Sequence, residues 1–420
     1  MTAPDDLASR LAAEHFSTRG GHLLVGEHTV EALAKRLGTP LFIYDAAVMR
    51  RSFRRLAEAV EGFATIYFSV KANPAVPVIR LFVEEGAGAE IASVGEYRKA
   101  IAAGAATDRI LFAGPGKRQA ELAEVVAGGI GEIHVETIEE LHRLEAIGRE
   151  ANRTVSIALR INPVAGVQGG AMRMGGKPAA FGFDEETLGD VLRLVADCPH
   201  VALTGLHLFA GTQMLDAAVL LKQWEHGLSL AASISAQLGR PLANVDLGGG
   251  LGIPYFAGDG ALDLGAIAAG IPALRRQVPA GTQVIVEPGR FLAGPAGLYV
   301  VGVNAVKQSR GQTFVITDGG MHHHLAASGN LGQVIKRDYP FVAPARMSEA
   351  PCAAPVTVVG PLCTPLDTLG RSVMLPEMRA DDLLAILQSG AYGPTASPIG
   401  FLGHPAPVEL LVDGARVEQV

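Results

Sequence analysis

The fold of this chain follows from a pattern that begins at Thr65-Ile66-Tyr67-Phe68-Ser69-Val70-Lys71-Ala72-Asn73-Pro74. The first six residues are apolar or β-forming and predict a buried strand, and the Asn-Pro pair is a stop signal. A helical pattern follows over Val76–Glu85. A strand followed by a helix is the repeating unit of parallel α/β folds, so this stretch predicts the first such unit of the chain.

The same alternation continues to about residue 286. Helical patterns separate the strand-like runs, for example Thr137–Glu150 and Asp216–Leu238. Eight β/α units predict an α/β fold of the (β/α)8 TIM-like barrel type, with a doubly wound open sheet as the alternative. In both architectures, functional residues lie at the C-terminal ends of the strands. The eight predicted strands are Thr65–Val70, Ala89–Ala92, Ile110–Ala113, Glu132–Val135, Val155–Ile161, Leu203–Phe209, Asn244–Leu247 and Gln283–Val286.

The alternation of strands and helices ends at about Leu298, and after it strand-like runs follow one another with little helical pattern between them. This change predicts a C-terminal all-β domain. Residues 20–44 read as two further strands split by a helix, so we expect the terminal segment to join that domain. The predicted division is a barrel over residues 45–297, a β domain from residues 19–44 and 298–420, and an N-terminal amphipathic helix over residues 1–18. The later predicted strands are Tyr299–Val306, Thr313–Thr317, Val356–Val359, Leu383–Leu387 and Val408–Val412.

Composition excludes several classes of protein. The 420 residues carry a formal net charge of −7 and no basic stripe, which argues against nucleic-acid binding. No uninterrupted apolar stretch reaches the roughly 18 residues of a membrane span, and the N-terminus lacks the apolar core of a signal peptide. Three cysteines make neither a disulfide framework nor a metal-binding pattern. We therefore expect a cytoplasmic protein without a membrane partner.

Unusual side chains and loops follow several predicted strands. Lys71 directly follows a predicted buried strand. Loss of solvation there would lower its pKa and favour Schiff-base chemistry, although a solvated charge at the end of a strand is the commoner role. Gly248-Gly249-Gly250 lets backbone N–H groups approach a phosphate, and we expect a following helix N-terminus to add a favourable dipole. Glu287 could be a base, a metal ligand or the partner of a protonated ring nitrogen. Together with Lys71, these residues fit pyridoxal 5′-phosphate.

These motifs resemble the fold-type III pyridoxal-phosphate-dependent decarboxylases, the family of the diaminopimelate, ornithine and arginine decarboxylases. The likeness covers about residues 25–415. It implies an α/β barrel with a C-terminal β domain and a head-to-tail homodimer whose active sites are shared between subunits. The motifs that carry it are Tyr67–Pro74, His207–Gln213, Asp246–Gly250, Glu287–Arg290, Gly360–Asp367 and Gly390–Gly393.

The resemblance also implies roles for single residues. Lys71 would hold the cofactor, and Cys363 of the opposite subunit would reprotonate the substrate carbon. The expected substrate-binding residues are Thr364, Asp367, His322 and Arg337. For Arg337 the alternative is a solvated charge on the surface without a binding role. No metal is expected, since consecutive histidines on a strand alternate in direction and His322-His323-His324 could not bind one ion. The expected cofactor-binding residues are Lys71, His207, Phe209, Thr212, Gly248, Gly249, Gly250, Glu287, Gly289, Arg290 and Tyr392.

Departures from the family pattern bear on the substrate. Thr364 stands where the family has an acid that binds the distal ammonium, and no arginine follows Asp318-Gly319-Gly320-Met321 at the place where diaminopimelate enzymes have one. Phe209 replaces the histidine that stacks on the cofactor. An unpaired buried ammonium would be costly, so lysine-like substrates are disfavoured.

With Met174-Gly175-Gly176 and Phe401–Pro405, these departures resemble a narrower group. It comprises the glutamyl-[acyl-carrier-protein] decarboxylase of butirosin biosynthesis and the decarboxylases associated with the exosortase system. The expected reaction is therefore decarboxylation of an amino acid without a free distal amine, such as a carrier-tethered glutamyl unit, with an acyl carrier protein as the partner. The alternatives are a diaminopimelate decarboxylase with an atypical pocket, an amino-acid racemase, and a catalytically inactive regulator.

Overall fold

A computed structural model describes residues 7–164, 172–173, 178–209 and 211–420. The chain divides into two compact units. One comprises Ser52–Ile253 and Ala261–Phe291, and the other comprises Met1–Arg51, Pro254–Gly260 and Leu292–Val420. We call them the barrel unit and the β unit and describe each by itself. The segment Pro254–Gly260 lies inside the predicted barrel range in sequence but belongs to the β unit by its contacts.

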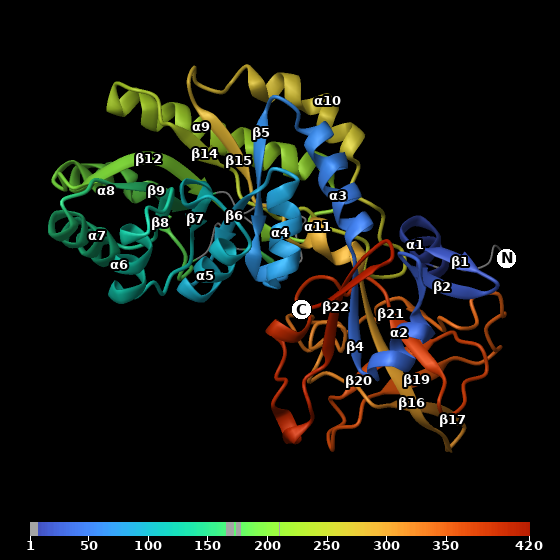
Figure 1. Ribbon diagram of the computed structural model, residues 1–420. Coiled ribbons are helices and arrows are strands. Elements are labelled where there is room, and N and C mark those ends of the chain that lie inside the picture. Colours follow the sequence, from blue (N-terminus) through green and yellow to red (C-terminus); the bar gives the residue numbers. More distant parts are fainter. Residues whose placement is uncertain (1–6, 165–171, 174–177, 210) are drawn as a thin grey trace. The chain divides into compact units, whose positions relative to one another are not determined.

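Eight parallel strands close the barrel unit within the described residues (Figure 1). Neighbours pair in the order β9-β12-β14-β15-β5-β6-β7-β8, and β8 pairs back onto β9 through Ile133–Ile157 and Val135–Leu159. This closing pair confirms the predicted barrel, because a doubly wound sheet would leave two edges. The strands are β5 (Ala64–Ser69), β6 (Gly88–Ile91), β7 (Ile110–Phe112), β8 (Glu132–Val135), β9 (Val155–Asn162), β12 (Val201–Leu208), β14 (Asn244–Asp246) and β15 (Gln283–Val286).

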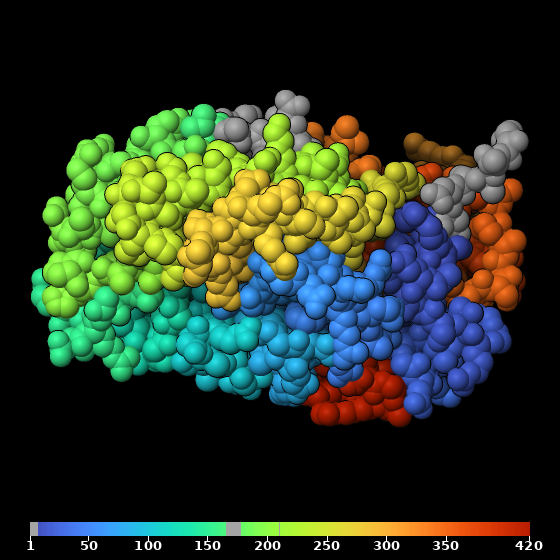
Figure 2. All heavy atoms as spheres, turned by 90° about the horizontal axis from the view of Figure 1, so that it is seen from above, coloured from blue at the N-terminus to red at the C-terminus, as the bar shows by residue number. Residues whose placement is uncertain are grey.

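Helices follow these strands and cover the outside of the barrel (Figure 1). Side-chain caps begin several of them, because a Ser, Thr or Asp oxygen accepts an otherwise unpaired backbone N–H, as Ser93 does for α5 and Thr137 for α7. Figure 2 shows α9 and α10 side by side on the barrel surface. The helices are α4 (Val76–Glu84), α5 (Val94–Ala102), α6 (Gln119–Ala127), α7 (Ile138–Ala151), α8 (Leu188–Ala196), α9 (Ala217–Leu238) and α10 (Leu264–Arg275), while α3 (Ala46–Ala59) and α11 (Arg290–Ala293) span the division between the units.

The β unit is built on the long strand β16 (Gly297–Ser309), which pairs with β4, β17 and β21. Its core is aliphatic and joins distant parts of the sequence, including Leu23, Leu41, Leu298, Leu387 and Leu410, all at most 1% exposed. The expected junction between the N-terminal segment and the C-terminal domain is therefore present. The other elements here are α2 (Val30–Leu37), β2 (His22–Val25), β3 (His28–Thr29), β4 (Leu41–Asp45), β17 (Gln312–Thr317), β18 (Phe341–Val342), β19 (Val356–Val359), β20 (Thr368–Val373), β21 (Leu383–Ile386), β22 (Val408–Asp413) and β23 (Arg416–Gln419).

Some short elements differ from the sequence-based expectation. The predicted N-terminal helix ends earlier than residue 18, because α1, described over Leu7–His15, is followed by strand β1 over Ser17–Arg19, which pairs with β2. The two-residue strands β10 (Met172–Arg173), β11 (Phe183–Asp184) and β13 (Gly211–Thr212) were not predicted, since so short a run carries no readable period. Among the described residues, no helix combines the length and hydropathy needed to cross a bilayer.

Candidate active site

Lys71 lies in a single 3-10 turn, η1 (Val70–Ala72), directly after β5. Its Nζ is 2.7 Å from Oε2 and 2.9 Å from Oε1 of Glu90, and Oε2 also accepts a hydrogen bond from the Ser69 hydroxyl. The Glu90 side chain is 1% exposed and that of Lys71 is 42% exposed. The sequence predicted only that the lysine would lose solvation. The structure adds a buried carboxylate that faces its amine.

Contacts between loops place Glu287 beside this lysine turn. Glu287 follows β15, and the next two residues reach back to β5, where the Ser69 N–H donates to the Pro288 carbonyl at 3.3 Å. A Cβ on Gly289 would lie 2.8 Å from the Cβ of Ala72, so only glycine allows the two loops to pack this closely. The ends of β5 and β15 thus form one continuous surface.

The glycine loop after β14 packs against the other side of Glu287. The Glu287 N–H donates to the Gly248 carbonyl at 2.8 Å, and a Cβ on Gly249 would lie 2.4 Å from the Glu287 carbonyl oxygen. Gly248 and Gly250 have φ of +69° and +93°, which side-chain-bearing residues rarely adopt. The Phe209 ring also adjoins this loop, because a Cβ on Gly248 would lie 3.3 Å from its Cδ2. The expected helix directly after the loop is absent, since among the described residues α10 begins only at Leu264.

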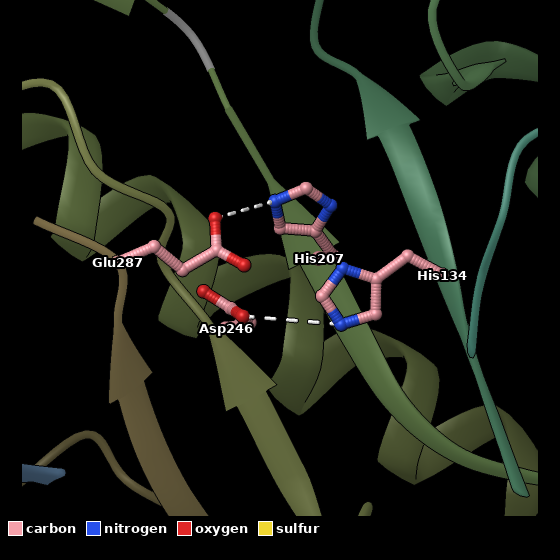
Figure 3. Close-up of side chains that lie close together, drawn as sticks. All are labelled: His134, His207, Asp246 and Glu287. Carbon is pink, nitrogen blue, oxygen red and sulfur yellow. Dashed lines mark ion pairs between the residues drawn. The ribbon is translucent and has the colours of Figure 1, made fainter. Parts of the chain in front are cut away.

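Beneath these loops, Glu287 belongs to a buried cluster with His134, His207 and Asp246 (Figure 3). One ligating atom from each residue lies within 4.8 Å of the others. His207 Nε2 is 3.4 Å from Glu287 Oε2, and His134 Nε2 is 3.9 Å from Asp246 Oδ2. The two imidazole rings are 4.2 Å apart between centroids. No side chain in the cluster is more than 3% exposed.

Burial and neighbouring groups shift the pKa values of three residues in this cluster. Burial, then the adjacent His134, lowers the pKa of His207 to about 4, so this imidazole is neutral at pH 7. Burial would raise the pKa of Glu287, but His207, His134 and Lys71 lower it below its usual value. Burial, then Glu287, raises the pKa of Asp246 well above its usual value. The pKa values of the two carboxyl groups are thus shifted in opposite directions.

A second buried network lies on the same side of the barrel. Glu132, His134 and Glu136 occupy alternate positions at the end of β8, and the Arg160 guanidinium donates to Glu136 at 2.7 Å. Lys117 Nζ is 2.6 Å from Glu140 Oε1, and burial lowers the pKa of this lysine. The signal for Glu132, His134 and Glu136 was the alternation of polar with apolar residues along the strand. Alternate residues of a strand lie on the same face, so this pattern indicates a row of polar side chains. Sequence reasoning missed this signal and also missed Glu90, and it named Asp246 only as the first residue of a motif, without a role.

The remaining expected site residues lie in the β unit. Cys363 is exposed, and Thr364 donates its N–H to the Leu362 carbonyl at 2.8 Å. Both Asp367 oxygens accept backbone N–H groups, from Met321 at 2.6 Å and from Leu362 at 2.9 Å. Asp367 therefore joins the loop that carries Cys363 to the loop that carries His322.

The three consecutive histidines occupy a turn and not a strand, contrary to expectation. The His322 ring lies 3.7 Å from that of His323 and 4.9 Å from that of His404 between centroids. Burial, then these two neighbours, lowers the pKa of His322 to about 4. His324 turns instead toward Ser389, at 3.1 Å.

The other expected residues divide between the two units. The Arg337 guanidinium packs 3.9 Å from the Phe256 ring and contacts Asp259 at 3.4 Å. Tyr392 has a φ of +54° and is partly buried. Thr212 lies on β13, and Arg290 begins α11. The motif Met174–Gly176 and residue Ala210 fall outside the described residues.

The barrel unit has the groups that pyridoxal phosphate requires. Glu287 Oε1 is buried and accepts no hydrogen bond from the described residues, so it suits a ring N–H donor. Lys71 supplies the amine, and the loops after β14 and β15 offer backbone packed too closely for any side chain. The residues present therefore fit the cofactor.

Comparisons with known proteins agree with this geometry. Residues 46–294 match the family model described as "Pyridoxal-dependent decarboxylase, pyridoxal binding domain". The chain is 38% identical over 398 residues to the L-glutamyl-[BtrI acyl-carrier protein] decarboxylase of Niallia circulans, covering 93% of this chain and 92% of the relative. It is 31% identical to a diaminopimelate decarboxylase of Methanothermobacter thermautotrophicus, covering 95% and 92%. A crystal structure of diaminopimelate decarboxylase from Helicobacter pylori with L-lysine is similar at a TM-score of 0.82 and 27% identity, covering 93% and 95%.

Proposed function

The chain belongs to the pyridoxal-dependent decarboxylases, and we propose that its substrate is an amino acid without a free distal amine, such as a glutamyl unit tethered to an acyl carrier protein. The observation that carries this proposal is the 38% identity, over 93% of the chain, to a decarboxylase of that kind. The enzyme is a carbon–carbon lyase that releases the substrate carboxyl group as CO2. When bound, pyridoxal phosphate accepts the electron pair that the departing carboxyl group leaves.

The residues of the barrel unit would divide the work of holding the cofactor. Lys71 would hold it through Nζ, with the Glu90 carboxylate beside the amine to take up a proton. Glu287, ionised and buried, would accept a hydrogen bond from the ring nitrogen and keep that nitrogen protonated. Gly248, Gly249 and Gly250, with Gly289, Arg290 and Tyr392, would surround the phosphate.

Proton return at the substrate carbon is assigned to Cys363 of the opposite subunit. Its exposed thiol would give a proton to the carbon that has lost CO2, and solvent would restore the thiol. This role requires the proposed homodimer with shared active sites, which sedimentation analysis of the purified protein tests. We also propose a cytoplasmic location, and a barrel domain over residues 45–297 from which Pro254–Gly260 is excluded.

The loop that carries Cys363 supports a substrate with an uncharged distal group. Thr364 has no charge, and both oxygens of Asp367 already accept backbone N–H groups. His322 is neutral at pH 7, and the Arg337 charge is paired with Asp259. None of these four groups offers a free carboxylate to a distal ammonium, whereas a neutral thioester needs none.

The test is CO2 release by the cofactor-loaded enzyme from two substrates in parallel. One is a glutamyl thioester on a carrier protein or a pantetheine mimic, and the other is meso-diaminopimelate. Turnover of the thioester alone is expected. Preferential turnover of meso-diaminopimelate would favour the second candidate, a diaminopimelate decarboxylase, which the 31% identity to such enzymes supports.

A further inference from the structure

Two carboxyl groups meet in the buried cluster of the barrel. Asp246 comes from β14 and Glu287 follows β15, and Figure 3 shows their carboxyl groups side by side. Both side chains are at most 3% exposed. Two ionised carboxylates at such a separation, away from water, repel strongly, so a pair of this kind retains one proton.

The surroundings decide which residue keeps the proton. Glu287 has His207 at 3.4 Å and is close enough to Lys71 to be affected by its charge. Asp246 faces His134 at the longer distance of 3.9 Å, and His134 in turn lies 3.4 Å from Glu132. One Asp246 oxygen, Oδ1, accepts the Gly248 N–H at 2.8 Å, which leaves Oδ2 to carry the proton. The stabilising groups therefore favour a charge on Glu287 and a proton on Asp246.

We propose that Asp246 is a positioning residue that remains protonated and donates a hydrogen bond to Glu287, holding that carboxylate in place for the cofactor ring nitrogen. This inference rests on the proposed function of Glu287. His207 Nε2 faces Glu287 Oε2, and Figure 3 shows the other Glu287 oxygen on the side of Asp246. A carboxylate oxygen has two lone pairs, so this oxygen can accept from Asp246 and from the cofactor. Burial and the nearby Glu287 raise the pKa of Asp246, which agrees with a proton retained on this residue.

The same four side chains also have the composition of a metal site, with two imidazoles and two carboxylates. A divalent cation would need both carboxylates ionised, whereas the proton-sharing arrangement keeps one of them neutral. The two descriptions therefore predict opposite protonation states for Asp246, and an experiment can separate them.

The decisive variant is Asp246→Asn in the full-length protein. Asparagine keeps an oxygen for the Gly248 N–H and supplies an N–H in the place of the carboxylic O–H, so it imitates the protonated acid. Pyridoxal phosphate should bind Asp246→Asn within about threefold of the wild-type affinity, with an unchanged visible spectrum. Asp246→Leu removes the donor and should weaken binding by roughly ten- to a hundredfold, the fold-change for a lost hydrogen bond to a charged group.

Infrared spectroscopy provides a readout that needs neither substrate nor cofactor. The wild type at neutral pH should show the carbonyl stretch of a protonated carboxylic acid, and Asp246→Asn should lose that band. Asp263→Asn, at an exposed helix cap, is the matched control and should keep it. A wild type without the band, stoichiometric tightly bound metal, or an Asp246→Asn variant that folds but binds the cofactor as weakly as Asp246→Leu would overturn the proposal. None of these outcomes depends on which substrate the enzyme decarboxylates.

Discussion

Replacing Gly249 by alanine tests whether the glycine loop holds Glu287 in position. The added Cβ would lie 2.4 Å from the Glu287 carbonyl oxygen and 3.2 Å from its carbonyl carbon. Both atoms belong to the backbone, so no flexible side chain can move aside. The first contact must lengthen to at least 3.0 Å, which displaces the loop, the residue that follows β15, or both.

The expected cost has two parts. Overpacking of this kind destabilises a folded protein by about 1–3 kcal/mol, so the free energy of unfolding of Gly249→Ala should fall by that amount. Displacing Glu287 also weakens a charge-assisted hydrogen bond to the ring nitrogen. If roughly half of its 1.5–3 kcal/mol is lost, the dissociation constant for pyridoxal phosphate rises by about three- to twelvefold.

The assay pairs urea unfolding of the cofactor-free protein with a spectroscopic titration of pyridoxal phosphate. Gly189→Ala is the matched control, because it lies in α8 and a Cβ there has no neighbour within 4 Å. That variant should bind the cofactor normally and gain about 0.5–1 kcal/mol from helix propensity. If Gly249→Ala binds the cofactor as tightly as Gly189→Ala, then the loop does not position Glu287 and the reasoning is wrong.

Three further predictions concern other parts of the chain. Mixing inactive Lys71→Ala with inactive Cys363→Ala should restore partial decarboxylase activity if subunits share active sites, and no recovery would contradict the shared-site dimer. His207 is held neutral with a pKa of about 4, so the unfolded chain binds more protons as the pH falls from about 6.5 to 4. The free energy of unfolding should therefore decline over that window by up to roughly 3 kcal/mol from this residue, and a His207→Gln variant should show a shallower pH dependence in urea unfolding. Thr364→Asp should raise the kcat/KM for meso-diaminopimelate relative to a glutamyl thioester, and an unchanged ratio would remove Thr364 from substrate selection.

Local patterns in the sequence were enough to predict most of the elements. The strand predicted at Glu132–Val135 has the observed limits, and that at Gln283–Val286 does as well. Such runs are readable because burial of a short apolar segment and the turn residues beside it are properties of neighbouring residues. For the same reason Lys71, Gly248–Gly250 and Glu287 could be recognised as residues that follow strands.

The partners of those residues depended on the tertiary structure. Glu90 faces Lys71 because β5 and β6 pair with Ser69 opposite Glu90, a register that no local pattern specifies. The cluster of His134, Asp246 and Glu287 likewise brings the end of β8 to the ends of β14 and β15, which lie more than a hundred residues further along the chain. Closure of the barrel through the pairing of β8 with β9 determines which inward-pointing side chains lie in the same layer of the barrel interior.

By itself, then, the sequence determined which segments form strands, which chemical groups stand at their ends and which family the chain resembles. Only the tertiary structure decided that the sheet closes, that the lysine meets a buried carboxylate, and that Asp246 lies against Glu287. The physical reason is that strand formation depends on nearby residues, whereas pKa values and close packing depend on groups brought together by long-range pairing.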